Sequence, residues 1–156
     1  MNNLNSTFKS ICGYYDIEKF ALSELIGIRN KKMNFSLYST YPAEWTQHYQ
    51  KENYHQFDPV FLNIGKIQLP FFWNSNSFKK MNYHQKKVFT EAYDFNITYG
   101  TTIPLAPEGN RHAYLTILNA EVAKSWPMMN KLALAANMYY SRKSYFEFIE
   151  FRKLIS

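Results

Sequence analysis

Cysteine and glycine are scarce in this sequence, and the common motifs of metal and phosphate binding are missing. A single cysteine, Cys12, allows neither a disulfide framework nor a thiolate metal cluster. The five glycines form no Gly-rich phosphate loop. The four histidines are too dispersed for a familiar ligand pattern, and neither HExxH nor CxxC occurs. We therefore expect no metal site and no cofactor.

Signs of enzymatic chemistry are equally few. The sequence has no G-x-S-x-G elbow, and Cys12 lies in an N-terminal stretch without a recognisable pattern. These absences do not exclude an enzyme, but together with the missing metal and phosphate motifs they argue against one. We therefore predict no catalytic residues and a non-enzymatic function.

Long apolar runs are also absent. No stretch of 18 apolar residues could span a membrane, and the polar residues 1–10 do not form a signal peptide. The 156 residues suffice for a single domain with one substantial core. These observations predict a soluble, cytoplasmic protein that makes no contact with a membrane.

Aromatic residues, by contrast, are abundant. The chain has 13 Tyr, 13 Phe and 3 Trp, which together make 19% of its residues. Such an excess fits a pocket walled by flat, rigid rings, although an ordinary aromatic core explains the composition equally well. Composition alone leaves both interpretations open.

The formal charge of +6 arises from 18 Lys and Arg against 12 Asp and Glu. A basic balance raises the possibility of a nucleic acid partner. The positive residues, however, occur as scattered pairs such as Lys31-Lys32, Lys79-Lys80 and Lys86-Lys87. Pairs of this kind are typical of solvated helix faces, so we expect no direct contact between this chain and nucleic acid.

Hydrophobic periodicity predicts an α+β fold. Helices are expected at residues 16–26, from Pro42 onward, and at residues 59–63, 82–95 and 125–153, and strands at residues 33–39, 69–73, 97–105 and 112–118. Asp16 would cap the first helix, which would turn Ile17, Phe20, Ala21 and Leu25 to one face. Residues 106–110 supply the turn residues of a hairpin loop. The order of elements favours a sandwich around a central antiparallel sheet.

A group of polar and aromatic residues lies in the middle of the chain. Trp45 and Tyr49 share one face of the helix that Tyr41-Pro42 opens, and Asp58 begins the next helix. An indole N–H only donates, a carboxylate only accepts, and a phenol does both. Their complement is a small apolar molecule with an amide and a further carbonyl. The competing interpretation is that the rings are core residues and Asp58 is only an N-cap.

The ordered set of motifs resembles the LuxR-type autoinducer-binding domain. The matching segments are Tyr41-Pro42-Ala43-Glu44-Trp45, Tyr49, Tyr54, Asp58-Pro59-Val60, Pro70-Phe71-Phe72-Trp73, Phe89, Ala92, Phe95, Ile97, Tyr99-Gly100, Thr102-Ile103-Pro104-Leu105 and Thr116. The resemblance covers about residues 39–119. It implies an α-β-α sandwich with about five antiparallel strands and helices on both sides, and it implies the sensing of an N-acyl-homoserine lactone in quorum sensing.

The resemblance also implies roles for individual residues. Trp45 would donate to the lactone carbonyl, Asp58 would accept from the ligand amide N–H, and Tyr41 and Thr116 would bond to the amide carbonyl. Tyr49 and Trp73 would wall the headgroup. Further pocket-lining residues are expected at Phe61, Val88, Ala92 and Ile97.

Two departures from the family pattern leave alternatives open. Residues 27–40 allow one strand where the family has two, and we expect residues 1–156 to be a single domain without a helix-turn-helix, either as a naturally short protein or as the sensor half of a longer one. We expect a dimer, either with itself or with a related regulator. The alternatives to a lactone sensor are a ligand-independent interaction module that forms heterodimers with complete regulators, and an enzyme that opens the lactone, for which the chain offers no nucleophile or metal.

Overall fold

The computed structural model describes residues 3–28, 32–63, 68–105, 111–118 and 124–155. The predicted hairpin loop at residues 106–110 lies outside these ranges. The elements in chain order are α1 (Asn3–Tyr14), β1 (Phe20–Ile28), β2 (Lys32–Ser39), α2 (Ala43–Lys51), the 3-10 helix η1 (Tyr54–Gln56), α3 (Pro59–Asn63), β3 (Phe71–Asn74), the 3-10 helix η3 (Ser75–Ser77), α4 (Tyr83–Asp94), β4 (Tyr99–Leu105), β5 (Arg111–Leu118) and α5 (Trp126–Ile155).

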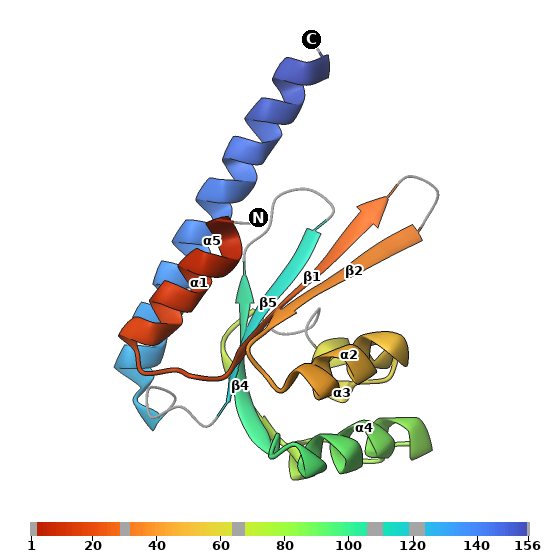
Figure 1. The fold of residues 1–156 in the computed structure, drawn as a ribbon. Helices are drawn as coiled ribbons and strands as arrows, with labels where there is room; N and C mark the ends of the chain where they lie inside the picture. Colours follow the sequence, from red (N-terminus) through yellow and green to blue (C-terminus); the bar gives the residue numbers. More distant parts are fainter. Residues whose placement is uncertain (1–2, 29–31, 64–67, 106–110, 119–123, 156) are drawn as a thin grey trace.

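The five strands form one antiparallel sheet in the order β2-β1-β5-β4-β3. Helices α1 and α5 cover one face of this sheet, and α2, α3 and α4 lie against the other (Figure 1). The predicted α+β sandwich with helices on both sides is therefore confirmed. The strands predicted at residues 33–39 and 112–118 are found within one residue of the expected limits, whereas β4 begins two residues later than predicted.

The helix predicted at residues 16–26 is wrong, because most of that segment is strand β1. Asp16 is not an N-cap; it adopts a left-handed conformation with a φ of 56° in the turn that follows α1. β1 is paired on both edges, with β2 and with β5, and Phe20, Ala21 and Leu22 at its start are buried on both faces of the sheet. A strand buried on both faces carries apolar residues at nearly every position, so its period is easily mistaken for that of a helix.

The N-terminal segment also differs from expectation. Residues that show no clear pattern form α1, in which Phe8 and Cys12 lie one turn apart and are both fully buried. The expectation of one strand before Tyr41 is likewise wrong, because β1 and β2 both precede it and pair in register from Ala21↔Ser39 to Ile28↔Lys32. The region before α2 therefore supplies two strands to the sheet.

Alternation along the strands separates two cores. Phe20 and Leu22 of β1 face α1 and α5, where a first core gathers around Phe8, Met129, Leu132 and Tyr140. A second core on the opposite face is built mainly from the helices α2, α3 and α4 and from the sheet. It contains Trp45, Tyr49, Tyr54, Val60, Trp73, Val88, Ala92, Ile97 and Leu118.

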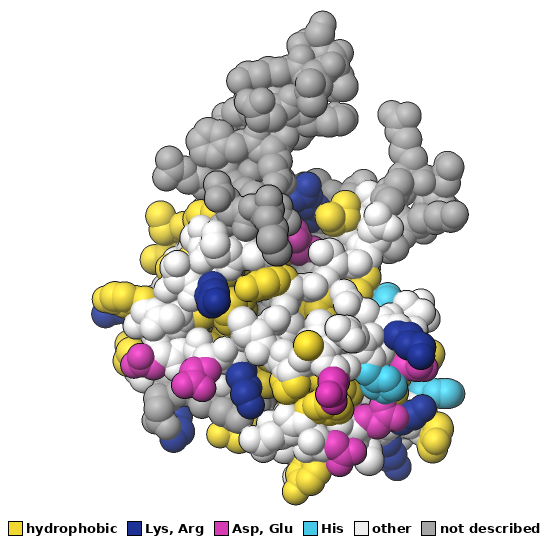
Figure 2. Space-filling model, in the orientation of Figure 1, with side chains coloured by type: hydrophobic (Ala, Val, Ile, Leu, Met, Phe, Trp, Pro, Cys, Tyr) yellow, Lys and Arg dark blue, Asp and Glu magenta, His cyan; other side chains and the backbone are white. Residues whose placement is uncertain are grey.

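Charged side chains are dispersed over the face shown in Figure 2. Lys and Arg side chains lie there among acidic ones, and no single basic patch is visible on that face. Among the described helices, none is both long and apolar enough to cross a bilayer.

Candidate functional site

A cavity lies between the sheet and the layer formed by α2, α3 and α4. Its walls are formed by Ala21, Ser23, Leu37, Tyr41, Trp45, Thr46, Tyr49, Asp58, Val60, Phe61, Trp73, Val88, Phe89, Ala92, Ile97 and Thr116. The volume of this cavity is about 80 Å³. One water needs roughly 10–15 Å³ by this measure, so the cavity has room for a small organic molecule once side chains adjust.

All ten residues singled out from the sequence line this one cavity. They are Tyr41, Trp45, Tyr49, Asp58, Phe61, Trp73, Val88, Ala92, Ile97 and Thr116. The structure thus brings together residues from α2, α3, α4, β3 and β5 and from the segments beside them. Their roles toward a ligand remain predictions.

Six lining residues were missed by the sequence analysis. Ala21, Ser23 and Leu37 belong to β1 and β2, and the mistaken helix at residues 16–26 hid the first two. Leu37 could have been found, because the alternation of residues 33–39 puts Phe35 and Leu37 on one face. The others are Thr46, Val60 and Phe89.

Asp58 is the carboxylate among the residues that line this cavity. Its Oδ1 accepts a hydrogen bond of 2.9 Å from the backbone N–H of Val60, so it caps α3, which Pro59 begins. Its Oδ2 accepts a hydrogen bond of 2.8 Å from the hydroxyl of Tyr49. Burial raises the pKa of Asp58, and the hydrogen bonds from Tyr49, Val60 and Phe61 offset this only in part. A further donor at this carboxylate would stabilise its charge.

Two donors that line the same cavity as Asp58 have no acceptor among the described residues. Trp45 is only 4% exposed, and its indole packs edge-on to the ring of Tyr49 at 5.8 Å between centroids. Within the described part of the chain, neither the indole N–H of Trp45 nor the hydroxyl of Tyr41 makes a hydrogen bond. Burial and the charge of Asp58 raise the pKa of Tyr41, so its hydroxyl keeps its proton. Both groups can therefore donate to a ligand.

The remaining wall is mostly apolar. Val88 and Ala92 lie one turn apart on α4, where the side chain of Asn82 caps the first turn and Asn96 (φ 60°) follows the last. Ile97 and Val60 are 5% and 6% exposed, and Phe61 meets the ring of Tyr114 edge-on. A flexible hydrocarbon chain suits such a surface.

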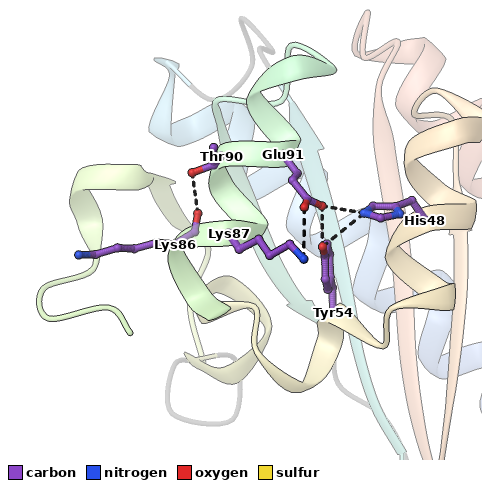
Figure 3. Close-up of polar contacts among 6 residues, drawn as sticks. All are labelled: His48, Tyr54, Lys86, Lys87, Thr90 and Glu91. Atoms are coloured by element: carbon purple, nitrogen blue, oxygen red, sulfur yellow. Dashed lines mark hydrogen bonds and ion pairs between the residues drawn. The ribbon is translucent and has the colours of Figure 1, made fainter. Parts of the chain in front are cut away.

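A polar cluster joins α2, η1 and α4 outside the cavity (Figure 3). Glu91 Oε2 lies 2.6 Å from His48 Nε2 and accepts a hydrogen bond of 2.5 Å from the hydroxyl of Tyr54, while Lys87 Nζ lies 3.6 Å from Oε1. Partial burial acts to raise the pKa of Glu91, but the hydrogen bonds from Tyr54 and His48 and the charge of Lys87 outweigh it and lower that pKa. The cluster therefore holds the three elements together behind Trp45.

No metal site is evident in the part of the chain that the structure describes, because no three His, Cys, Asp or Glu side chains are grouped there in a suitable way. His55 stacks on Phe35 with 4.3 Å between ring centroids, and burial lowers its pKa. It serves as a neutral aromatic group beside the cavity.

Comparison with known proteins identifies the domain. The family described as the autoinducer binding domain matches residues 2–142. The transcriptional activator protein EchR of Dickeya chrysanthemi is 33% identical over 121 residues, which are 77% of this chain and 46% of that protein. The chain spans about half the length of the curated relatives it matches.

Solved structures share the fold at low sequence identity. The N-acylhomoserine lactone-dependent LuxR family transcription factor CepR2 from Burkholderia cenocepacia superposes with a TM-score of 0.71 at 15% identity, covering 90% of this chain and 86% of that one. SdiA in complex with octanoyl-rac-glycerol gives a TM-score of 0.64 at 18% identity, covering 89% and 61%. These two likenesses concern the fold alone.

Proposed function

Because this chain belongs to the autoinducer-binding domain family, we propose that it is a quorum-sensing receptor domain that encloses one N-acyl-homoserine lactone. The observation that supports this most directly is the chemistry of the cavity. The carboxylate of Asp58 lies in a mainly apolar enclosure together with Trp45 and Tyr41, two donors that have no acceptor among the described residues. An acyl-homoserine lactone has the complementary groups, which are one amide N–H, two carbonyls and an apolar tail.

In the proposed complex, Asp58 accepts from the ligand amide N–H. Trp45 donates to the lactone carbonyl, and Tyr41 and Thr116 donate to the amide carbonyl. The hydroxyl of Tyr49 already donates to Asp58, and the indole N–H of Trp73 already donates to Thr102, so both residues form part of the cavity wall. A hydrogen bond to the charged carboxylate contributes roughly 1.5–3 kcal/mol.

The acyl tail would lie along the apolar wall formed by Phe61, Val88, Ala92 and Ile97. Each buried methylene contributes about 0.8 kcal/mol, so tail length has a large effect on affinity. A six-carbon tail would thus outweigh any single hydrogen bond of the headgroup. The relatives named as transcriptional activators are not enzymes, and we propose no catalytic step for this domain.

The direct test is thermal melting with acyl-homoserine lactones of increasing tail length. A ligand at 100 times its dissociation constant adds about 2.7 kcal/mol to the free energy of unfolding. For a domain of this size we expect the melting temperature to rise by about 5–10 °C with the preferred lactone. Octanoyl glycerol, which is the ligand in one SdiA structure, tests whether a lactone ring is needed.

Homoserine lactone without a tail serves as the ligand control, and we expect it to cause no shift at the same concentration. A cooperative melting transition whose temperature no lactone raises would contradict the proposal. That result would instead support the ligand-independent interaction module. Recovery of a ring-opened product after incubation would support the lactone-opening enzyme.

The proposal includes self-association through α5. Leu134 and Met138 lie one turn apart on its outer face and are 62% and 65% exposed. We expect the lactone-bound domain to sediment as a dimer and Leu134→Lys combined with Met138→Lys to sediment as a monomer with the lactone still bound. Asn130→Lys, at an exposed polar position of the same helix, is the matched control. A monomer in the unsubstituted protein would leave a related regulator as the partner to test.

A further inference from the structure

Three side chains form a hydrogen-bonded row across β3, β4 and β5 at the edge of the cavity. The indole Nε1 of Trp73 donates to Thr102 Oγ1 at 3.0 Å, and Thr102 Oγ1 lies 2.9 Å from Thr116 Oγ1. Thr102 and Thr116 are direct neighbours in the register of β4 and β5. Trp73 is 4% exposed and Thr102 is fully buried, so solvent does not compete for these groups.

The direction of this row follows from the donors and acceptors. An indole N–H can only donate, so Thr102 Oγ1 must accept from Trp73. The hydroxyl hydrogen of Thr102 then needs an acceptor, and within the described residues its one other side-chain partner is Thr116. The opposite orientation would leave a buried hydroxyl hydrogen without an acceptor, which is unfavourable. Thr102 therefore donates to Thr116.

This direction determines what Thr116 can do at the cavity. Thr116 Oγ1 already accepts from Thr102, and Thr116 lines the cavity. Its own hydroxyl hydrogen is thus left for a ligand. Asp58 shows the opposite property, because an ionised carboxylate can only accept. The two residues present a donor and an acceptor, and a secondary amide in one orientation matches both.

We propose that Thr102 is a positioning residue for ligand recognition: it holds Thr116 as a hydrogen-bond donor, so the cavity selects a ligand with a carbonyl at that point. The inference rests on the proposed function. Thr102 touches no ligand itself and acts through Thr116. Trp73 contributes by occupying the acceptor side of Thr102.

Calorimetric titration with the preferred lactone tests this proposal. We expect Thr102→Val to weaken binding by about 3- to 10-fold, which corresponds to one neutral hydrogen bond. Thr102→Ser keeps the hydroxyl and should bind within about twofold of the unsubstituted protein. In a Thr116→Val background, Thr102→Val should have no further effect, because the donor it positions is gone.

A thioamide analogue of the ligand separates positioning from general stability. Sulfur is a weak acceptor, so replacing the carbonyl oxygen should weaken binding to the unsubstituted protein more than to Thr102→Val. Thr102→Val could fail to fold because the Trp73 N–H loses its acceptor. In that case the double variant Trp73→Phe with Thr102→Val removes both partners of that hydrogen bond. Its affinity is then compared with that of Trp73→Phe alone.

Equal affinities of Thr102→Val and Thr102→Ser would overturn this inference while leaving the proposed function intact. An undiminished effect of Thr102→Val in the Thr116→Val background would overturn it as well. Failure of the unsubstituted protein to bind any lactone would instead overturn the proposed function, together with the role assigned to Thr102.

Discussion

Asp58→Asn is expected to weaken lactone binding by roughly 10- to 150-fold, which is the loss of a charge-assisted hydrogen bond of about 1.5–3 kcal/mol. Asparagine has nearly the same shape and keeps one oxygen that can accept from the Val60 N–H. Its NH2 group takes the place of the other oxygen and accepts no hydrogen bond, so neither the hydroxyl of Tyr49 nor the ligand amide can donate there. Titration calorimetry with the preferred lactone measures the change directly.

Without ligand, Asp58→Asn should affect the stability of the fold, and this effect should be favourable. Burial raises the pKa of Asp58 above its ordinary 3.8. A carboxyl group with a raised pKa in the folded protein favours folding below its ordinary pKa, and this contribution is lost as the pH rises through the raised value. We therefore expect Asp58→Asn to gain stability relative to the unsubstituted protein as the pH rises from about 4 toward neutrality.

Asp94→Asn is the matched control, because this substitution makes the same chemical change at an exposed position at the end of α4. It should not change lactone affinity by a measurable amount. A loss of affinity in Asp94→Asn equal to that in Asp58→Asn would point to net charge rather than to a contact with the ligand. Unchanged affinity in Asp58→Asn would remove Asp58 from the site.

Gly100→Ala is expected to destabilise the fold by about 1–3 kcal/mol, the usual cost of forcing an extra carbon into a packed core. A Cβ at position 100 would lie 2.8 Å from the main-chain oxygen of Ile117 and 2.8 Å from Cζ2 of Trp73. The backbone of β5 cannot move without disturbing the sheet, so the indole of Trp73 must shift. Lactone affinity should fall too, because Trp73 walls the cavity. Denaturant unfolding and calorimetry measure the two effects.

Gly13→Ala provides the control for this change. A Cβ there meets no atom within 4 Å, and Gly13 lies within α1. Because alanine is the better helix former, this substitution should stabilise the protein by up to about 1 kcal/mol. Lactone affinity should stay the same. A Gly100→Ala protein as stable as the unsubstituted one would mean that the sheet yields at β4 more readily than its packing indicates.

The sequence predicts the side of the molecule that holds the cavity better than the opposite side, and the reason is local chemistry. Pro42 and Asp58-Pro59 start helices by rules that involve only a few neighbouring residues, and Trp45 and Tyr49 share a face by helical spacing alone. All of these expectations agree with the structure. That the predicted site residues would line one cavity was expected only from the family resemblance, because spacing along the chain does not bring α2, α4 and β5 together.

β1 shows why the remaining expectations failed. Phe20 and Leu22 belong to one core while Ala21 and Ser23 face the cavity, so apolar residues on both faces conceal the strand period. The partners that make it a strand, β2 and β5, lie up to about a hundred residues away in the chain. The direction of the Trp73, Thr102 and Thr116 row likewise depends on strand register, which a single sequence does not disclose.

Strand β5 separates two sets of residues that can diverge independently. Its even-numbered residues Thr116 and Leu118 face the side of the sheet that holds the cavity, and its odd-numbered residues Leu115 and Ile117 belong to the core beneath α1 and α5. Under the proposed function, a substitution at Thr116 would alter the surface that a signal molecule meets, while the residues of β5 beneath α5 stay the same. A receptor of the proposed kind could therefore change its signal preference one residue at a time without rebuilding the helical face proposed for self-association.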